Sequence, residues 1–342
     1  MSREMKERNA SVDIFRLICA IMVVSIHTAP LSELGYQWSY VTVQILPRIG
    51  VPFFFCTMGY YYIGSLLKEE YRFWQTMKRI LITYGLWSLI YYIPDARQVL
   101  EGNVSLGGFL LNCLRQFLIY GSREHFWFFP AVFFSVIMAT LFAKAGKLSW
   151  LAGMSVVAYV LGLLGCSYYG IGNRIPVISA LVNFSQYDFI RRVVLMGLPF
   201  FMMGYFLQKT DLKNMENKKC MIWEGIFAVV FLIEIIVVNK LQIQKNVYIT
   251  VFLYPLLFCT MLLLLKNPCE KYGKTAVVTR DLANFIYYSH PLFIMGIHLV
   301  MNWCAGRNAR ETELFLLTVV SALSVGYLLH RVDNKYLNKL IR

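Results

Sequence analysis

Charged residues are scarce in this chain, and long apolar runs take their place. Lysine, arginine, aspartate and glutamate make up 15% of the 342 residues, while hydrophobic residues make up 58%. A soluble globular protein of this size does not need so much apolar material. The apolar runs last about 16–22 residues, which suits membrane-spanning helices and is too long for the alternating strands of a β-barrel. The composition therefore predicts an all-α polytopic membrane protein, in which one membrane domain fills residues 1–342 and no soluble domain is present.

Several motifs that mark common enzyme classes are absent. The sequence contains no H-E-x-x-H, no P-loop and no G-x-S-x-G, so a metal site or a nucleotide-hydrolysis site is unsupported. The eight cysteines form no C-x-x-C pair, and most fall in or beside apolar runs, where cysteine is usually a small buried hydrophobe. We therefore expect no metal cofactor.

Ten apolar segments are long enough to be expected membrane spans. They lie at about 12–30, 47–66, 80–94, 126–143, 149–166, 193–208, 221–239, 247–265, 282–302 and 312–330. The long connection 95–124 contains an apolar stretch too short to span, which predicts an interfacial or re-entrant helix. Similar strings, PFFFCTMGYY and PFFMMGYF, occur in the second and sixth spans and hint at an internal repeat.

The positive charge of the chain is distributed unevenly between the two sides of these spans. The net charge is +14, and about two-thirds of the 33 lysines and arginines fall on the side that holds the N-terminus. By the positive-inside rule, both termini are expected in the cytoplasm, with the protein in the cell membrane. The basic charge thus indicates topology and gives no reason to expect a nucleic-acid partner. Because the first apolar run holds an arginine and a histidine, we expect it to be a retained span and not a cleaved signal.

Three ionisable residues lie in the first span: Asp13, Arg16 and His27. At ~100° per residue, the eleven positions from Arg16 to His27 make three turns plus about 20°, so both side chains share one helix face. The same spacing is roughly 16 Å of rise, about half of the hydrocarbon thickness. Asp13 can pair with Arg16 three positions later. Ionisable groups in a membrane helix are costly and are therefore candidate functional residues; the alternative is a snorkelling ion pair with an interfacial histidine.

Other polar residues near the spans allow both a functional and a structural interpretation. His125 lies in an aromatic cluster, which is typical of a membrane interface and also compatible with a site. Asp188 and Arg191 form an i,i+3 pair at a helix start, either as a structural ion pair or as part of a site. His290 precedes a proline, which marks either a broken helix or a packed hydrogen bond. Glu234 either faces a cavity or lies near the end of its helix.

A set of motifs occurs in a fixed order along nearly the whole chain. It comprises Asp13-x-x-Arg16, R-x10-H from Arg16 to His27, Arg48-x-x-x-Pro52-Phe53-Phe54, Gly59-Tyr60, His125-x-Trp127-Phe128, Tyr287-x-x-His290-Pro291 and Arg331-x-Asp333. In this order the motifs resemble those of the acyltransferase-3 family of bacterial integral membrane acyltransferases. The chain is similar to surface-polymer O-acetyltransferases and to the membrane domain of vancomycin-resistance serine racemases. The latter similarity includes the pair Asp188-x-x-Arg191.

The resemblance implies an activity and a set of roles. It implies about ten helices, an acyl-CoA donor (usually acetyl-CoA) that enters from the cytoplasm, and O-acetylation of a hydroxyl on a cell-envelope glycan or another small acceptor. By the same resemblance, His27 would be the general base and Arg16 would hold the donor. Arg48, His125 and Trp127 would line the acceptor half of the path. Further residues with a catalytic or binding role by resemblance would be Asp13, Asp188, Arg191 and His290.

The chain also departs from the family pattern. Met58 stands where the family usually has a serine, and no glycine follows Asp13; both changes could alter acceptor choice. Another class of function, a small-molecule transporter or permease with serine as the candidate substrate, would use the same polar membrane site. A transferase needs a mouth that admits CoA, whereas a transporter needs only a small gated site at the midplane.

Overall fold

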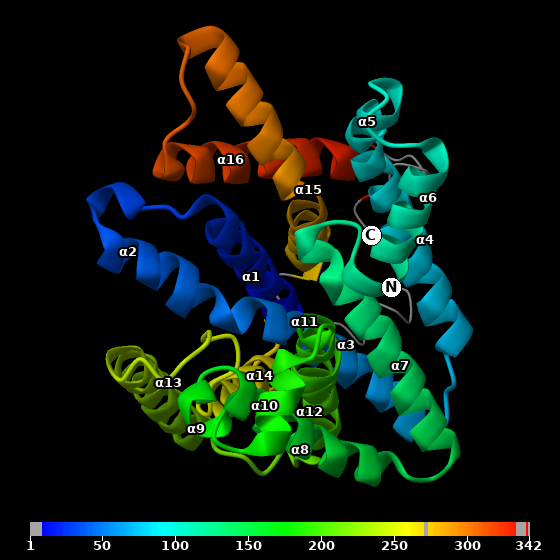
Figure 1. Ribbon diagram of the computed structural model, residues 1–342. Helices are drawn as coiled ribbons and strands as arrows, with labels where there is room; N and C mark the ends of the chain where they lie inside the picture. Colours follow the sequence, from blue (N-terminus) through cyan, green and yellow to red (C-terminus); the bar gives the residue numbers. More distant parts are fainter. Residues whose placement is uncertain (1–8, 270–272, 333–339, 341–342) are drawn as a thin grey trace. The chain divides into compact units, whose positions relative to one another are not determined.

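A computed structural model describes residues 9–269, 273–332 and 340. Helices build this part of the chain, and no strand occurs in it (Figure 1). The helices are α1 (Ala10–Thr28), α2 (Tyr36–Tyr40), α3 (Gly50–Leu67), α4 (Phe73–Asp95), α5 (Arg97–Leu100), α6 (Leu106–Arg115), α7 (Phe128–Lys144), α8 (Leu148–Gly165), α9 (Tyr169–Gly172), α10 (Pro176–Asn183), α11 (Tyr187–Ile190), α12 (Leu198–Lys209), α13 (Asn217–Lys240), α14 (Leu253–Lys266), α15 (Gly273–Ala305) and α16 (Glu311–Arg331).

Short turns of other helical types extend several of these helices. Three of them are π-helical: η3 (Val41–Ile45), η5 (Gln116–Tyr120) and η7 (Arg191–Gly197). Three are 3₁₀-helical: η2 (Ser32–Leu34), η4 (Leu46–Ile49) and η6 (Glu124–Trp127). Because η7 joins α11 to α12, residues 187–209 form one continuous helical stretch that includes a wide turn at Arg191.

Seven helical stretches among the described residues are long and apolar enough to cross a membrane. They are Ala10–Thr28, Tyr36–Leu67, Glu124–Lys144, Leu148–Gly165, Tyr187–Lys209, Asn217–Lys240 and Glu311–Arg331. These stretches confirm the all-helical class and agree with a multi-pass membrane protein. The expected spans 80–94 and 282–302 fall within α4 and α15, whereas of the expected span 247–265 only the part from Leu253 is helical, as the short helix α14. A total of ten crossings stays a prediction.

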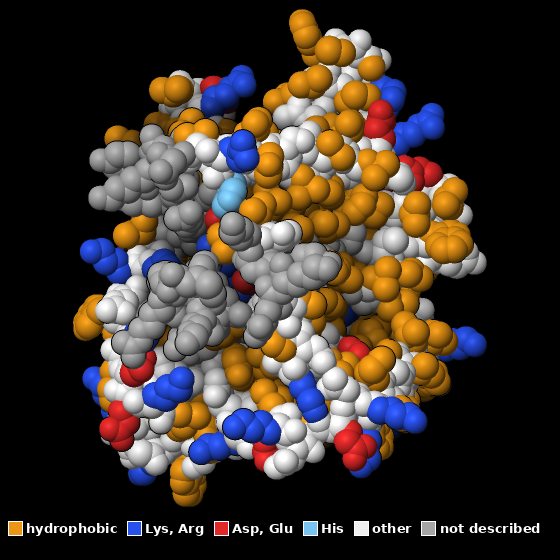
Figure 2. Space-filling model, turned by 180° about the vertical axis from the view of Figure 1, so that it is seen from behind, with side chains coloured by type: hydrophobic (Ala, Val, Ile, Leu, Met, Phe, Trp, Pro, Cys, Tyr) orange, Lys and Arg blue, Asp and Glu red, His pale blue; other side chains and the backbone are white. Residues whose placement is uncertain are grey.

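Many large apolar side chains lie on the surface of the structure. They cover much of the face shown in Figure 2. Trp74 and Trp150 are largely exposed, as are the leucines at one face of α6, including Leu106 and Leu111. A soluble protein rarely exposes so much contiguous apolar surface, whereas a membrane helix must present such side chains to lipid. The short apolar helix α6 occupies the stretch that was expected to be interfacial or re-entrant.

The chain divides into two compact units. The first unit comprises Met1–Phe54, Thr210–Leu241 and Thr250–Arg342, and the second comprises Phe55–Lys209 and Gln242–Ile249. Helices α1, α15 and α16 share a buried core in the first unit, formed by Ala20, Val24, Ala283, Ile286 and Ala322. Such small side chains let membrane helices approach one another closely. His27 of α1 contacts His290 of α15, and the core residues Ala20 and Ala283 each lie seven positions before these histidines, so the two helices run parallel.

The sequence allowed two interpretations of Glu234. In the structure, its side chain caps a neighbouring helix of the first unit. Its two carboxylate oxygens accept hydrogen bonds from the backbone nitrogens of Val251 and Phe252, at 2.7 and 2.9 Å. These residues immediately precede α14, whose first turn leaves backbone N–H groups without helical partners. A negative charge at this position also complements the helix dipole. Glu234 therefore belongs to the packing of α13 against α14, where it caps the start of α14.

Removing the Glu234 carboxylate should destabilise the first unit. In Glu234→Ala, two part-buried N–H groups lose their acceptors, which is expected to cost roughly 2 kcal/mol. In Glu234→Gln one acceptor oxygen remains, and the loss should be smaller. The midpoint of thermal unfolding in detergent measures both, with the exposed Glu216→Ala as control. Equal midpoints for Glu234→Ala and Glu216→Ala would contradict the capping role.

A second acidic cap joins the segment after α1 to the start of α16. Glu33 accepts hydrogen bonds from the backbone nitrogen of Thr312 at 2.8 Å and from its hydroxyl at 2.7 Å. These bonds lower the pKa of the Glu33 carboxyl from its ordinary value. A carboxyl with a lowered pKa stabilises the fold above its unfolded pKa, and this contribution is lost as the pH falls through the folded pKa.

The Glu33 cap therefore predicts a pH-dependent stability difference. Wild type should unfold at a higher temperature than Glu33→Gln at about pH 6, and the difference should shrink toward about pH 3 as the carboxyl is protonated. Thermal unfolding of both proteins across this range measures it. A difference that stays constant down to about pH 3 would show that the charge of Glu33 plays no part.

Candidate functional site

The three ionisable residues of the first span lie on one unbroken helix. The side chain of Asn9 begins α1 by accepting a hydrogen bond from the nitrogen of Val12 at 3.2 Å. The same side chain donates to the carbonyl oxygens of Leu264 and Leu265 at the end of α14, which fixes where α1 starts. The helix then continues to Thr28, so His27 lies in its last turn. The expected common face for Arg16 and His27 follows from this continuity.

The face of α1 that carries Arg16 and His27 is called the stripe below. The Asp13–Arg16 pair expected at its start is present. Arg16 Nη1 lies 3.4 Å from Asp13 Oδ1. The Arg16 side chain is 17% exposed and that of Asp13 is 10% exposed. A mostly buried cation beside a mostly buried carboxylate is a poor snorkelling pair, because snorkelling places the charged head in water. Of the two interpretations of Arg16, the geometry therefore favours a functional residue inside the first unit over a snorkelling ion pair.

A second histidine lies beside His27 at the other end of the stripe. The rings of His27, which is exposed, and His290, which is fully buried, have centroids 5.0 Å apart. Helix α15 continues through Pro291, so of the two alternatives for His290 the packed hydrogen bond is the observed one. The close packing of α1 on α15 brings together two histidines that are far apart in the sequence.

The position of His290 has a local cause in the following proline. Pro291 has no backbone N–H, so the carbonyl of Tyr287 lacks the usual helical donor four residues later. His290 Nδ1 lies 3.0 Å from this carbonyl oxygen and 3.0 Å from that of Ile286. As carbonyls only accept hydrogen bonds, Nδ1 carries the proton, and Nε2 is the ring nitrogen with acceptor character in the neutral form. The His-Pro step thus fixes both the orientation and the tautomer of His290.

Arg48 is the remaining expected site residue of the first unit. It lies in η4 and is buried. Its Nε donates to the carbonyl oxygen of Gln44 at 2.9 Å, and its Nη2 donates to the side-chain oxygen of Gln44. These two bonds hold the guanidinium plane in a set orientation.

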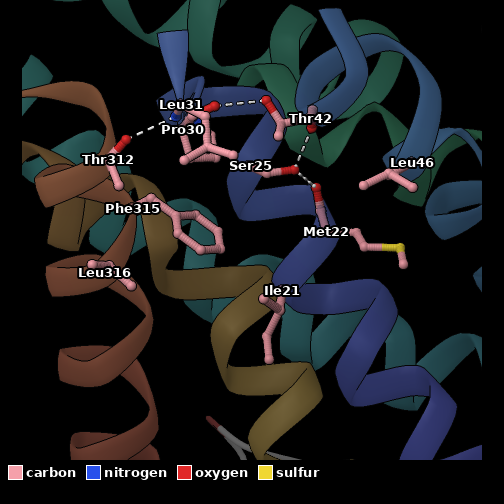
Figure 3. A pocket seen from close by; sticks show the side chains of 10 residues that line it. All are labelled: Ile21, Met22, Ser25, Pro30, Leu31, Thr42, Leu46, Thr312, Phe315 and Leu316. Carbon is pink, nitrogen blue, oxygen red and sulfur yellow. Dashed lines mark hydrogen bonds between the residues drawn. The ribbon is translucent and has the colours of Figure 1, made fainter. Parts of the chain in front are cut away.

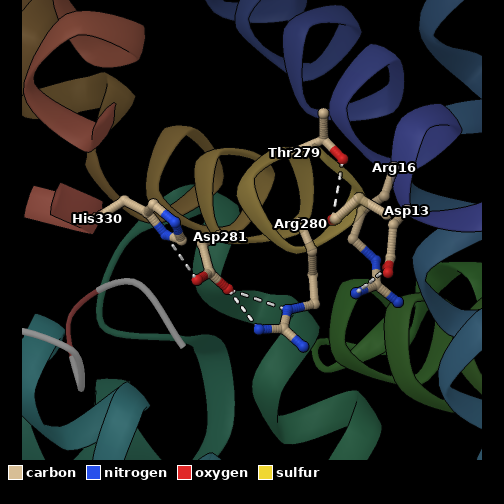
Figure 4. A network of polar contacts seen from close by, with 7 residues as sticks. Asp13, Arg16, Thr279, Arg280, Asp281 and His330 are labelled. Atoms are coloured by element: carbon tan, nitrogen blue, oxygen red, sulfur yellow. Dashed lines mark hydrogen bonds and ion pairs between the residues drawn. The ribbon is translucent and has the colours of Figure 1, made fainter. Parts of the chain in front are cut away.

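The first unit also contains a polar network that the sequence analysis missed (Figure 4). Asp281 Oδ1 accepts hydrogen bonds from Arg280 Nε and Nη2 at 3.0 and 2.6 Å. Its other oxygen, Oδ2, lies 3.1 Å from His330 Nδ1 on α16. The Asp281 side chain is fully buried. In the sequence, Arg280 and Asp281 look like loop charges before a span, and His330 is the last residue of the expected span 312–330, next to a basic tail.

The second unit holds the other expected site residues. His125 is buried in η6, with its ring centroid 4.0 Å from that of Phe126 and 5.7 Å from that of Tyr91. The Trp127 ring lies 5.7 Å from that of Phe55, and the Arg192 guanidinium carbon lies 5.9 Å from its centroid. His125 thus sits in an aromatic cluster, while Trp127 contacts a cation.

The pair expected at the start of the sixth span is also present. Arg191 Nη2 lies 3.0 Å from Asp188 Oδ1, and the Arg191 guanidinium carbon lies 4.7 Å from the ring centroid of Tyr248. Arg191 is buried, whereas Asp188 is largely exposed. The arginine begins the π-helical turn η7, and such turns are frequent at functional sites. A buried arginine between an acid and an aromatic ring is well placed to bind an anion or a polar ligand.

The first unit also has an apolar cavity of about 320 Å³, shown in Figure 3. It is lined in part by Ile21, Met22 and Ser25 of α1. At ~100° per residue, these residues lie roughly 140–240° around the helix from Arg16. The cavity therefore opens on the opposite face of α1 from the Arg16–His27 stripe. Its hydroxyl groups bond within the protein, for example Ser25 to the carbonyls of Met22 and Thr42, so it offers little to a polar substrate.

Metal binding has no support in the described part of the chain. Among these residues, no group of three or more histidine, cysteine, aspartate or glutamate side chains could hold a metal ion.

Comparison with known proteins identifies related sequences along almost the entire length. A family described as an acyltransferase domain matches residues 9–331. An amino-acid racemase of Enterococcus faecalis is 30% identical over 338 residues, which are 97% of this chain and 47% of the racemase. A serine/alanine racemase of Enterococcus gallinarum is 26% identical over 333 residues, 94% of this chain and 45% of that protein. The chain thus spans about half the length of these relatives. No solved structure matches.

Proposed function

Since the chain belongs to the acyltransferase-3 family, we propose that it is a membrane O-acyltransferase. In this proposal it moves an acetyl group from acetyl-CoA to a hydroxyl of an exported or cell-surface glycan, or of another small acceptor. The observation that supports this reaction best is the exposed His27 beside the buried His290, on the same helix stripe as Arg16. One domain of ten spans would carry the activity, with both termini in the cytoplasm and the protein in the cell membrane.

The proposed reaction uses His27 as a general base. A neutral imidazole accepts the proton of the acceptor hydroxyl while the oxygen attacks the thioester carbonyl. A carbon–oxygen bond forms, the carbon–sulfur bond breaks, and the proton passes from His27 to the CoA thiolate. His290, oriented by its bonds to backbone carbonyls, would limit rotation of the His27 ring. It would act as a positioning residue.

The arginines would bind the charged or polarised parts of the substrates. Arg16, held by Asp13, would bind the donor about 16 Å of helix rise from His27. Arg48 would contribute to the acceptor side from the first unit. The acceptor-side residues of the second unit would be His125, Trp127, Asp188 and Arg191.

A small-molecule transporter is the second candidate function, and it is suggested by the names of the related proteins. The relative from Enterococcus gallinarum is named a serine/alanine racemase, and its matching part could supply or move the amino acid. The chain covers less than half of that protein, so racemisation does not transfer to it. A small-molecule transporter, with serine as the first substrate to test, would use the same stripe as a midplane site.

Two assays on one preparation separate these functions. Purified protein in lipid vesicles would receive acetyl-CoA with a cell-envelope glycan fraction, and release of free CoA thiol would be followed. The same vesicles would be tested for serine uptake. Acceptor-dependent thiol release without uptake supports the transferase. Uptake without thiol release would replace it by the transporter.

A further inference from the structure

Two arginines lie at nearly the same depth on neighbouring helices of the first unit. Helices α1 and α15 run parallel, and His27 of α1 faces His290 of α15. Arg16 is eleven residues before His27, which is roughly 16 Å of helix rise, and Arg280 is ten residues before His290, roughly 15 Å. Figure 4 shows the side chains of Arg16 and Arg280 at this end, extending to the same side of the two helices.

Both arginines are mostly buried and use few of their donors within the described residues. Arg16 is 17% exposed, and its one ion pair there is the 3.4 Å contact with Asp13. Arg280 is 18% exposed, and its hydrogen bonds there go to Asp281 through Nε and Nη2. A guanidinium has five N–H donors, and the partial exposure of both side chains leaves donors that Asp13 and Asp281 do not use open to a ligand. Donors at the same depth on two neighbouring helices therefore favour a ligand rich in acceptor oxygens.

The second arginine is held by a network that spans two helices. The fully buried carboxylate of Asp281 binds Arg280 with one oxygen and His330 of α16 with the other. A fully buried carboxylate needs such partners. In return, the carboxylate holds Arg280 in one orientation, with Nη1 directed away from Asp281. The network thus orients the Arg280 guanidinium so that its remaining N–H donors can bind a ligand.

We infer that Arg16 and Arg280 together bind a phosphate group of the acyl-CoA donor, with Asp281 and His330 as the residues that position Arg280. This inference rests on the proposed function. Phosphate oxygens suit the planar fork of a guanidinium, which can bind two of them at once. The site would hold the nucleotide part of the donor at the Arg16 end of α1, while the acyl arm extends along the stripe toward His27.

Direct binding of CoA tests the inference without any turnover. Purified wild type and Arg280→Ala would be titrated with CoA and with pantetheine, which lacks the phosphates. We expect Arg280→Ala to weaken CoA binding about 10- to 100-fold, the effect of losing hydrogen bonds to a charged group, and to leave pantetheine binding unchanged. Arg307→Ala, at an exposed arginine on the segment after α15, is the matched control and should bind CoA like wild type.

Two further variants separate ligand binding from a fold defect. Arg280→Lys keeps the charge and should bind CoA with intermediate affinity. Asp281→Asn should weaken CoA binding, and adding it to Arg280→Ala should cause little further loss, because both changes act through one guanidinium. Equal effects of Arg280→Ala on CoA and pantetheine would indicate general damage and overturn the inference.

The remaining outcomes distinguish the inference from the function on which it rests. If wild type binds CoA and Arg280→Ala binds it equally well, the inference is wrong and the proposed function stands. If wild type binds no CoA, the proposed function itself fails. A lipid headgroup could offer the same phosphate chemistry. Loss of co-purified anionic lipid in Arg280→Ala, with CoA affinity unchanged, would assign the arginine to lipid and overturn the inference.

Discussion

Replacing His27 with alanine is expected to reduce acyl transfer about 10²–10⁴-fold, the usual contribution of a general base. The loss should appear in kcat, because His27 is proposed to act on the acceptor hydroxyl and not to hold the donor. The KM for acetyl-CoA should therefore change little. Steady-state release of CoA thiol by the purified protein measures both constants.

Two histidines of α15, His290 and His298, make this experiment specific. His290→Ala removes the neighbour of His27 and should lower kcat by a smaller factor, since it removes positioning and not the base itself. His298→Ala changes a histidine of the same helix that has no proposed role, and should leave kcat near the wild-type value. If His298→Ala lowers kcat as strongly as His27→Ala, the loss reports general damage to the helix pair.

Replacing Gly59 with alanine is expected to destabilise the second unit strongly. Gly59 of α3 and Gly204 of α12 lie against each other. A methyl group on Gly59 would lie 1.9 Å from the carbonyl oxygen of Phe201, and one on Gly204 would lie 2.3 Å from the backbone nitrogen of Tyr60. Because backbone atoms of a packed helix cannot move aside alone, the helices must separate. We expect a cost of about 3 kcal/mol, the upper end for overpacked cores.

The second unit offers a matched control for this substitution. Gly153 lies inside α8, and a methyl group there would meet no atom within 4 Å. Gly153→Ala should therefore be neutral or slightly stabilising, because alanine has the higher helix propensity. Thermal unfolding and the yield of monodisperse protein would compare the two variants. Equal midpoints for Gly59→Ala and Gly153→Ala would show that α3 and α12 do not pack through their glycines.

The glycine contact also shows what a sequence repeat can and cannot reveal. The strings PFFFCTMGYY and PFFMMGYF hint at a relation between two spans, and their glycines, Gly59 and Gly204, prove to be the point where α3 meets α12. Close backbone approach is a common use of glycine in membrane helices. The sequence does not say which helices approach each other, because that depends on the packing of many other side chains.

The stripe of α1 could be predicted because it depends only on helix geometry. Once residues 10–28 form one helix, the shared face of Arg16 and His27 and the pairing of Asp13 with Arg16 follow. The neighbour of His27 could not be predicted in the same way. His290 reaches it through tertiary packing, and local sequence around a His-Pro step allows a broken helix equally well.

The buried acids were the hardest residues to interpret from the sequence. Glu234 binds backbone N–H groups 17 and 18 positions later, which a periodicity argument within its own helix does not detect. Asp281 lies beside Arg280 at the start of an expected span, where charges are usually loop residues. Its burial and its bond to His330 depend on α16, a separate helix. In both cases the partner is set by the packing of a second helix.

The central claim is that this chain transfers an acyl group with His27 at the centre of its site. The most direct test is transfer of labelled acetyl from acetyl-CoA to a cell-envelope acceptor by the purified protein in vesicles. The account predicts label in the acceptor with wild type and Arg307→Ala, and almost none with folded His27→Ala. Label transfer that continues undiminished in His27→Ala would contradict the assigned base, and no transfer by wild type, alongside serine uptake, would contradict the reaction itself.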